Sequence, residues 1–241
     1  YKKGAPTQNH AVNVAGGSEL STFALGFSYT EQEGILGYNK IDPVNADYKR
    51  YTARINSDHI IIKTSNRDII KIGQTLNFSL SKNNGIQQGD IYWNDVHNYM
   101  VANPLLPAYT YDGDGNVSGW YDQNAKDADG WTYSPKEANP LALSALSSRG
   151  KNESNNFTLQ TSAYLQVEPI KDLVFKSQFG FKYSSNTDRY YTSEYYLSTQ
   201  TEEPVDDVSQ SAIIVYNWTL DNTISYRFEL DDHLFYSIIG Q

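Results

Sequence analysis

Polar and apolar residues alternate one by one along much of this 241-residue chain. Successive side chains of an extended strand point to opposite faces of a sheet, so a period of two predicts β-strands. In Ile70–Ser81, isoleucine, leucine and phenylalanine alternate with lysine, threonine, asparagine and serine. Eight such stretches occur, and the clearest are Thr22–Thr30, Ile70–Ser81, Asn156–Val167 and Ala212–Phe228.

The connections between these stretches alternate strictly between short and long. In an up-and-down antiparallel sheet every second connection lies at the same end, so this order predicts one rim of tight turns and one rim of long loops. Outer-membrane barrels have this asymmetry. The short connections are Gly16–Glu19, Ser65–Asp68, Glu168–Asp172 and Glu229–Asp232, and the long ones are Glu31–Asp47, Asn83–Asn152 and Ser184–Gln210.

Alternation alone leaves open which face of the sheet is inside, because a soluble barrel or sandwich has the same pattern as a membrane barrel turned inside out. Strand length separates the two. Strands of soluble proteins typically have about 5–6 residues, whereas a tilted strand needs about 9–11 to cross a bilayer. Several stretches here keep the alternation for twelve residues or more. We therefore predict an all-β fold, an antiparallel up-and-down transmembrane β-barrel.

This interpretation assigns each strand residue to lipid or to the barrel lumen. The bulky residues are expected to face lipid: Phe23, Leu25, Phe27, Ile72, Leu76, Phe78, Phe157, Leu159, Phe179, Phe181, Trp218 and Leu220. The small and hydrophilic residues between them are expected to face the lumen: Arg54, Lys71, Asn77, Gln160, Lys176, Gln178, Asn217 and Thr219.

Composition agrees with a strand-based membrane protein. The chain has no cysteine, which excludes disulfides and thiol chemistry. It has no run of the roughly 20 apolar residues that a spanning helix needs, so strands must make any membrane contact. The 20 tyrosines fit the aromatic girdles of a barrel, or equally an exposed β surface. A net charge of −9 disfavours nucleic acid as a partner.

Several local motifs resemble the barrel of SusC-type TonB-dependent transporters of Bacteroidetes, and they occur in the same order. The likeness spans nearly the whole chain but covers only the middle portion of such a barrel. The matching segments are QNHAVNVAGGSELSTFALGFSYTEQEGIL (Gln8–Leu36), YKRYTARINSDH (Tyr48–His59), IKIGQTLNFSLS (Ile70–Ser81), NPLLPAYTYDGDGN (Asn103–Asn116), NPLALS (Asn139–Ser144), LVFKSQFGFKY (Leu173–Tyr183), WTLDNTISY and HLFYSIIGQ.

The resemblance implies a longer protein with a TonB box, a plug domain and a 22-stranded barrel, of which residues 1–241 would supply about eight strands. Neither the plug nor the TonB box can be located in this sequence, and the chain stops inside the last predicted strand, which starts at His233. We therefore expect a piece of a transporter that is unable to fold alone, since it would leave two unpaired strand edges.

The resemblance also implies a function and its partners. Such a transporter imports a glycan or an oligopeptide across the outer membrane of a Gram-negative cell. It works with a SusD-like surface lipoprotein that closes over the barrel, and with TonB, which acts on the plug. The sequence does not separate glycan from peptide cargo. The alternative from another functional class is a soluble or cell-surface carbohydrate-binding module with a β-rich fold and no transport role.

The predicted loop Asn83–Asn152 is rich in aromatic residues, which offer large apolar area with a polar group. Such rings suit contacts with cargo or with a partner protein. A loop of this length also needs a small core of its own, and its aromatic residues are the obvious material. The candidates for ligand or lid contact are Trp93, Tyr99, Trp120 and Trp131.

Catalytic and metal-binding patterns are weak in this sequence. The run DGDGN at Asp112–Asn116 resembles a calcium loop, but Val117 and Gln123 stand where such a loop needs glycine and a bidentate glutamate. A hairpin turn is the better interpretation. The sequence has no HExxH or GxSxG motif. We predict that the protein is not an enzyme and that it has no metal site and no cofactor. Strand arginines, namely Arg50, Arg54 and Arg227, are expected to pair with acidic neighbours or to contact a plug.

Overall fold

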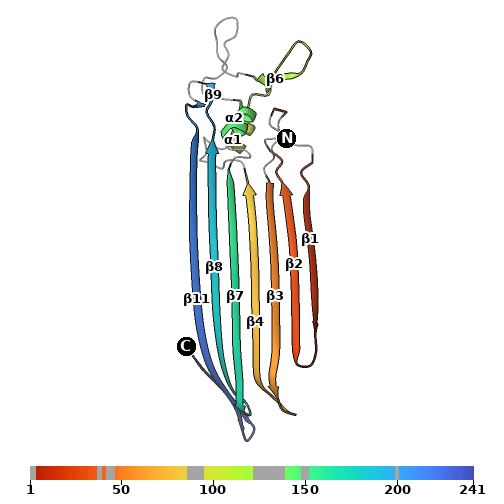
Figure 1. Cartoon of the computed structure of the whole chain (residues 1–241), viewed down its shortest axis with the longest axis vertical. Helices are drawn as coiled ribbons and strands as arrows, with labels where there is room; N and C mark the ends of the chain where they lie inside the picture. The colour runs from red at the N-terminus through yellow and green to blue at the C-terminus, as the bar shows by residue number, and fades with distance from the viewer. Residues whose placement is uncertain are drawn as a thin grey trace.

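The computed structural model describes residues 4–36, 40–41, 47–85, 95–121, 139–147, 152–198 and 201–241. Within these residues the chain forms one long, antiparallel, eight-stranded sheet in which sheet neighbours follow chain order (Figure 1). The all-β, up-and-down prediction is therefore confirmed. In sheet order the strands are β1 (Thr7–Gly17), β2 (Ser21–Glu33), β3 (Asp47–Lys63), β4 (Asp68–Asn84), β7 (Glu153–Ile170), β8 (Leu173–Thr192), β11 (Asp207–Leu230) and β12 (His233–Gly240).

The remaining described elements are short and lie in the long connections. The connection from β4 to β7 contains two helices and a hairpin, and the one from β8 to β11 contains a second hairpin. Neither of these helices has the length or apolar character to cross a membrane, a finding that concerns helices alone. The elements are α1 (Asp95–Val101), β5 (Tyr109–Tyr111), β6 (Val117–Trp120), α2 (Pro140–Ser147), β9 (Tyr195–Ser198) and β10 (Thr201–Glu203).

Tight turns lie at one end of the sheet and long connections at the other, as the sequence predicted (Figure 1). The turns from β7 to β8 and from β11 to β12 are two residues long. Each contains an aspartate with a positive φ, Asp172 at 64° and Asp231 at 53°. Aspartate tolerates this left-handed conformation better than most residues, which lets the strands reverse within two residues.

One predicted loop is much shorter than expected. The sequence placed a loop over Ser184–Gln210, but β8 continues to Thr192 and β11 begins at Asp207, and these extensions pair with each other in register. The prediction failed because tyrosine occupies both faces here: the neighbours Tyr190 and Tyr191 obscure the alternation. At 24 residues, β11 extends far beyond the roughly 9–11 that a bilayer requires.

The cross-strand register divides the sheet into two chemically different faces. Residues paired across antiparallel strands share a face, so the pairs Phe27–Ala53, Ala53–Phe78 and Phe78–Leu159 trace a continuous apolar surface. All twelve bulky residues predicted to face lipid lie on this side, which we call the apolar face. The eight hydrophilic residues predicted for the lumen lie on the opposite side, the polar face.

No protein layer covers either face within the described residues. The buried apolar side chains there are Ala142 and Ala145, both in α2, whereas large residues of the apolar face are open. Trp218 is 67% exposed, and Phe27 and Leu220 are each 52% exposed. The ladder also stays open: in the described part of the chain β1 pairs with β2 alone and β12 with β11 alone. In the part of the chain that the structure describes, the sheet is a single layer without a hydrophobic core.

Candidate functional site

The polar face is built from rows of side chains that run across the sheet, one residue from each strand. The central row is hydrophilic over most of its length and contains two cations, one each on β3 and β8. Cross-strand pairing gives this row as Asn13, Gly26, Arg54, Asn77, Gln160, Lys182 and Asn217. Four residues that the sequence nominated separately as lumen candidates, Arg54, Asn77, Gln160 and Asn217, are thus brought into line.

The other nominated residues lie closer to the short turns. Lys71 and Lys176 both pair with Gln166 and so belong to one row. Gln178 pairs with Tyr164 in the adjacent row of the polar face, on the side of the central row. Lys71 also forms an ion pair with Asp68, with 2.8 Å between Nζ and Oδ2. These contacts give the turn end of the polar face a mixed charge, and the assignment of this face to a lumen stays a prediction.

Arg50 and Arg54 differ from the expected pattern of paired arginines. Arg50 donates from Nε to the Ser79 hydroxyl at 3.3 Å, and Arg54 donates from Nε to the side-chain oxygen of Asn56 at 3.2 Å. Neither has a carboxylate within ion-pair distance among the described residues. Arg227 does pair, with 3.8 Å between its Nη2 and Glu229 Oε1.

A hollow of about 380 Å³ opens beside the two arginines. Thr52 and Ser79 line it with hydroxyl groups, and Asn77 and Gln160 line it with amides. These groups donate and accept hydrogen bonds but carry no charge. The arginines therefore provide the charge of this hollow.

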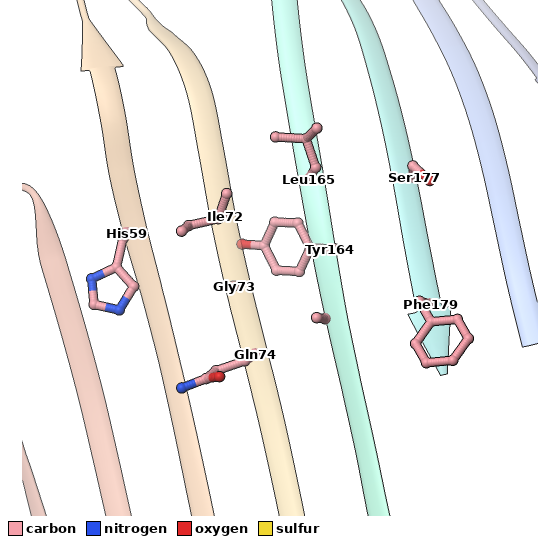
Figure 2. Close-up of a pocket in the computed structure, with 9 residues that line it drawn as sticks. His59, Ile72, Gly73, Gln74, Tyr164, Leu165, Ser177 and Phe179 are labelled. Carbon is pink, nitrogen blue, oxygen red and sulfur yellow. The ribbon is translucent and has the colours of Figure 1, made fainter. Parts of the chain in front are cut away.

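Nearer the short turns, the ring of Tyr164 lies across Gly73 on the neighbouring strand (Figure 2). Its hydroxyl donates to Asp58 Oδ1 on β3 at 2.6 Å, and the ammonium of Lys176 lies 4.6 Å from its ring centroid. A β-carbon at Gly73 would lie 2.2 Å from the Tyr164 ring and 2.4 Å from the Asp58 oxygen. Glycine is required here because the ring occupies the space of a side chain.

A second hollow, of about 530 Å³, is drawn in Figure 2. Its lining includes His59, Gln74 and Phe179, which the register assigns to the apolar face together with Ile72 and Leu165. His59 is held by a 3.0 Å hydrogen bond between its Nδ1 and the Ser21 hydroxyl. This hollow is larger than the one beside the arginines but opens mainly on the opposite side of the sheet.

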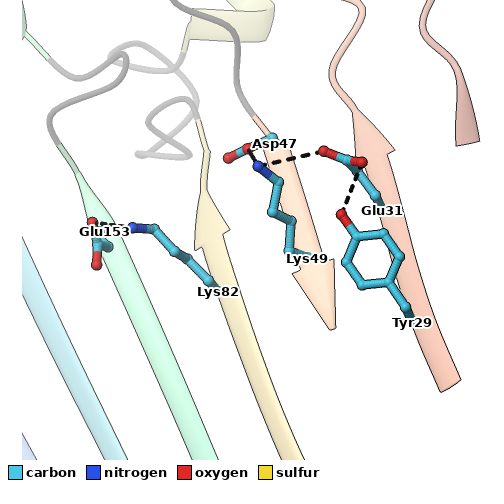
Figure 3. A network of polar contacts seen from close by, with 6 residues as sticks. All are labelled: Tyr29, Glu31, Asp47, Lys49, Lys82 and Glu153. Atoms are coloured by element: carbon cyan, nitrogen blue, oxygen red, sulfur yellow. Dashed lines mark hydrogen bonds and ion pairs between the residues drawn. The ribbon is translucent and has the colours of Figure 1, made fainter. Parts of the chain in front are cut away.

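A network of charged residues lies at the long-connection ends of β2 and β3 (Figure 3). Lys49 Nζ is 3.0 Å from Asp47 Oδ2 and 3.4 Å from Glu31 Oε1, and Tyr29 donates to Glu31 Oε2 at 2.9 Å. The hydrogen bond from Tyr29 and the nearby Lys49 lower the pKa of Glu31. The bonds to Asp47 and Glu31 raise the pKa of Lys49 to about 12. Glu31 and Lys49 are therefore charged at neutral pH.

A second ion pair lies further along the same end of the sheet. Lys82 on β4 and Glu153 on β7 are 2.7 Å apart, between Nζ and Oε2 (Figure 3). The Asn155 amide and Lys82 lower the pKa of Glu153. Because Lys49 and Lys82 are paired in the register with each other, on the same side as Tyr51 and Leu80, the apolar face ends here in charged residues.

The aromatic loop candidates divide into two groups. Trp93 and Trp131 lie outside the described residues. Tyr99 and Trp120 are half-buried inside the folded part of the loop: Tyr99 hydrogen-bonds the buried Ser144 hydroxyl at 2.5 Å, and Trp120 stacks on Tyr109 with 5.5 Å between centroids. Both rings thus pack within the loop, and their contact with cargo or a lid stays a prediction.

Asn139 holds the folded part of this loop together and was not singled out by the sequence analysis. It is 2% exposed. Its Oδ1 accepts from the backbone N–H groups of Leu141 and Ala142, which makes it the N-cap of α2 before Pro140 at the first helical position. Its Nδ2 donates to the carbonyls of Ala108 and Tyr121 at either end of the β5–β6 hairpin.

The DGDGN run forms the turn of that hairpin, as the sequence predicted. Asp112 Oδ1 accepts from the backbone N–H of Asp114 at 3.0 Å and of Asn116 at 2.8 Å. The bond from Asn116 is the main reason that the Asp112 pKa is lowered. The carboxylate is thus used by its own turn. In the part of the chain that the structure describes, no group of three His, Cys, Asp or Glu side chains has the geometry of a metal site.

Comparison with known proteins identifies the fold. No family model matches the chain, and no curated protein matches it either. Among solved structures, chains of the RagAB peptide importer in the closed-closed state (18% identity) and in the open-open state (19%), and of the RagAB peptide transporter (19%), each superpose with a TM-score of 0.67. Each alignment covers 98% of this chain and 24% of the matched chain.

The described sheet therefore shares its fold with a part of each of these chains. At these identities the likeness concerns the fold, and this chain spans about a quarter of the length of the chains it matches.

Substitution of Gly73 by alanine should destabilise the sheet. The new methyl group overlaps the Tyr164 ring and the Asp58 carboxylate, so the ring must move and its hydrogen bond must break. We expect a loss of about 1–3 kcal/mol in the free energy of unfolding, measured by urea titration of the native protein in lipid vesicles. Gly113→Ala is the control because open space surrounds Gly113. Equal midpoints for the two variants would show that the packing around Gly73 is loose.

Substitution of Asn139 by alanine should loosen the connection between β4 and β7 and leave the sheet intact. The change removes the cap of α2, which is worth about 0.5–2 kcal/mol. It also removes the hydrogen bonds that the Asn139 amide donates to the Ala108 and Tyr121 carbonyls, although Ala108 still accepts from the Tyr121 backbone N–H. We expect faster cleavage of the loop by protease added to the purified native protein. Asn139→Asp keeps the cap acceptors and should show an intermediate rate. A rate like that of the unaltered protein in Asn139→Ala would contradict this role.

Proposed function

We propose that this chain is part of the barrel of a SusC-like, TonB-dependent transporter that imports oligopeptides or glycans across the outer membrane of a Gram-negative cell. The observation that carries the proposal is an antiparallel single-layer sheet whose apolar face has no protein cover in the described residues and whose other face is hydrophilic. The transporter fold found in the structural comparison supports it.

Lipid is the solvent that such an apolar face requires. Each large side chain left in water forgoes about 1.5–3 kcal/mol of burial free energy, and the face carries many of them, including Phe27, Trp218 and Leu220. The backbone groups are already paired within the ladder, which is the condition for crossing hydrocarbon. The ionised groups at Lys49 and Lys82 fit the point where the sheet leaves the membrane on the long-connection side.

The polar face then lines the lumen. Arg54, Asn77, Gln160 and Asn217, with Lys71, Lys176 and Gln178 nearer the short turns, would meet water, plug or cargo there. Charged side chains at membrane depth are expected in a water-filled interior and mark the path of a substrate. No step of this function needs catalysis by the chain, which we propose to be a transporter and not an enzyme.

The long connections supply the outer rim. We propose that residues 83–152 form a long extracellular loop that meets cargo and a SusD-like lipoprotein lid, and that the short turns face the periplasm. Energy would come from TonB acting on a plug outside residues 1–241. Peptide cargo is favoured over glycan because the structural neighbours are described as peptide importers.

A soluble or surface-bound carbohydrate-binding module is the second candidate function. The stacked pair of Tyr109 and Trp120 offers aromatic surface of the kind that binds sugar rings. A soluble module, however, needs a second layer over the apolar face, and the described residues supply none. The two candidates differ in whether the native protein requires detergent or lipid to stay dispersed.

Arginine substitutions at two adjacent positions of β4 test the membrane assignment directly. Leu76 lies on the apolar face and Asn77 on the polar face. Leu76→Arg should cost about 2–4 kcal/mol of stability in lipid vesicles, whereas Asn77→Arg should cost much less, because a lumen side chain stays hydrated. The free energy of unfolding of each variant is measured by urea titration. Equal costs, or a greater cost at Asn77, would reject lipid as the solvent of the apolar face.

Removal of three loop tryptophans tests the lid contact. Trp93→Ala, Trp120→Ala and Trp131→Ala together should weaken co-purification of a surface lipoprotein and lower cargo uptake, because a few aromatic anchors usually carry such interfaces. The barrel itself should assemble in normal amounts, since loops tolerate change. Tyr236→Ala, an exposed ring on β12 near the short turns, is the control. Unchanged uptake and co-purification would mean that these rings pack the loop only.

A further inference from the structure

The side chains of Arg50 and Arg54 are anchored in the same way. Each guanidinium donates a hydrogen bond from its Nε to an uncharged oxygen. Arg50 donates to the Ser79 hydroxyl, and Arg54 donates to the side-chain oxygen of Asn56. The terminal Nη groups have no hydrogen-bond or ion-pair partner in the described part of the chain. Both side chains are exposed, and both line the hollow of about 380 Å³ on the polar face. Each guanidinium is therefore held in place through its Nε, and its Nη groups are available to a ligand.

The charge around these arginines is one-sided. Four successive rows of the polar face run from the row of Arg50 to the row of Asn56, and within the described strands their charged members are Arg50, Arg54 and Lys182. The nearest acids on this face lie one row beyond, Asp58 and Asp221 towards the turns and Asp188 on β8 towards the long connections. Asp58 already accepts a hydrogen bond from Tyr164.

We propose that Arg50 and Arg54 form a carboxylate-binding site that selects acidic oligopeptides as cargo. This inference rests on the proposed function, because it requires the polar face to line the lumen. An aspartate or glutamate side chain of the peptide enters the hollow and accepts hydrogen bonds from the Nη groups. Thr52, Ser79, Asn77 and Gln160 hydrogen-bond the peptide backbone around it.

The chemistry favours a carboxylate for two reasons. The planar guanidinium matches the two oxygens of a carboxylate and binds them through parallel hydrogen bonds, which are stronger than those between neutral groups. A lumen that has low-dielectric walls and positive side chains also concentrates anions. The four-residue separation puts the two α-carbons roughly 13 Å apart on β3, and both long side chains reach the hollow between them.

The test uses the full-length native protein, returned to its own host in place of the deleted gene. Uptake is measured with two synthetic peptides that differ only in charge, one containing glutamates and the other glutamines at the same positions. For Arg50→Gln with Arg54→Gln, the concentration of acidic peptide needed for half-maximal uptake should rise about ten-fold or more, as expected for the loss of charge-assisted hydrogen bonds. Uptake of the neutral peptide should not change.

A matched control removes two cations elsewhere. Arg227→Gln with Lys171→Gln lowers the charge equally at the short-turn end, where both residues already have acidic neighbours. It should leave uptake of both peptides unaltered. A charge reversal, Arg50→Glu with Arg54→Glu, should in addition turn the preference towards a lysine-containing peptide. The amount of each variant in the outer membrane is measured alongside.

The outcomes separate this inference from the function on which it rests. If the unaltered protein takes up neither peptide, the proposed peptide import is overturned, and the site with it. If it takes up peptides but Arg50→Gln with Arg54→Gln affects acidic and neutral peptides equally, the carboxylate site is overturned while transport stands. That result would assign the arginines to a carboxylate of the plug. A selective loss of acidic uptake, absent in the control pair, supports the site.

Discussion

The structure depends on one constraint: a wide apolar sheet face must be kept out of water although the described residues add no second layer to the sheet. In an ordinary β-sandwich a facing sheet meets this need, and the shared core supplies most of the free energy of folding. Here the buried apolar side chains of the described residues are Ala142 and Ala145, both in α2 of the connection between β4 and β7. In the membrane environment that we propose, the hydrogen-bonded ladder and the apolar solvent of a bilayer stabilise such a sheet.

The same constraint fixes the character of the opposite face. If lipid covers one side, the other side encloses water, and residues that a protein core would exclude become tolerable there. Arg54, Lys182 and their amide neighbours are examples. Close packing on this face is local: Tyr164 fills the space over Gly73 and ties β7 to β3 through Asp58. The rest of the face remains open to a ligand.

The sequence predicted strands, faces and turn rims well because each rests on a period-two pattern that is local in the chain. Strand ends were less predictable, since the tyrosines of β8 beyond Ser184 suit both faces. The loop helices and the cap at Asn139 carry no such period. Contacts such as Tyr164 over Gly73, and the lack of a carboxylate beside Arg50 and Arg54, depend on register and on neighbours distant in sequence. Single-sequence patterns do not contain that information.

The measurement that tests the central claim most directly is the solvent exposed to each successive residue of β4. Single cysteines from Ile70 to Ser81 carry a spin label in the native protein in lipid vesicles, and this chain contributes no background cysteine. Collisions with oxygen, which concentrates in lipid, and with a water-soluble nickel complex are then compared. The account predicts two oscillations of period two in opposite phase, with oxygen maximal at Ile72, Leu76 and Phe78. Oscillations in phase, or high nickel accessibility at those positions, would contradict it.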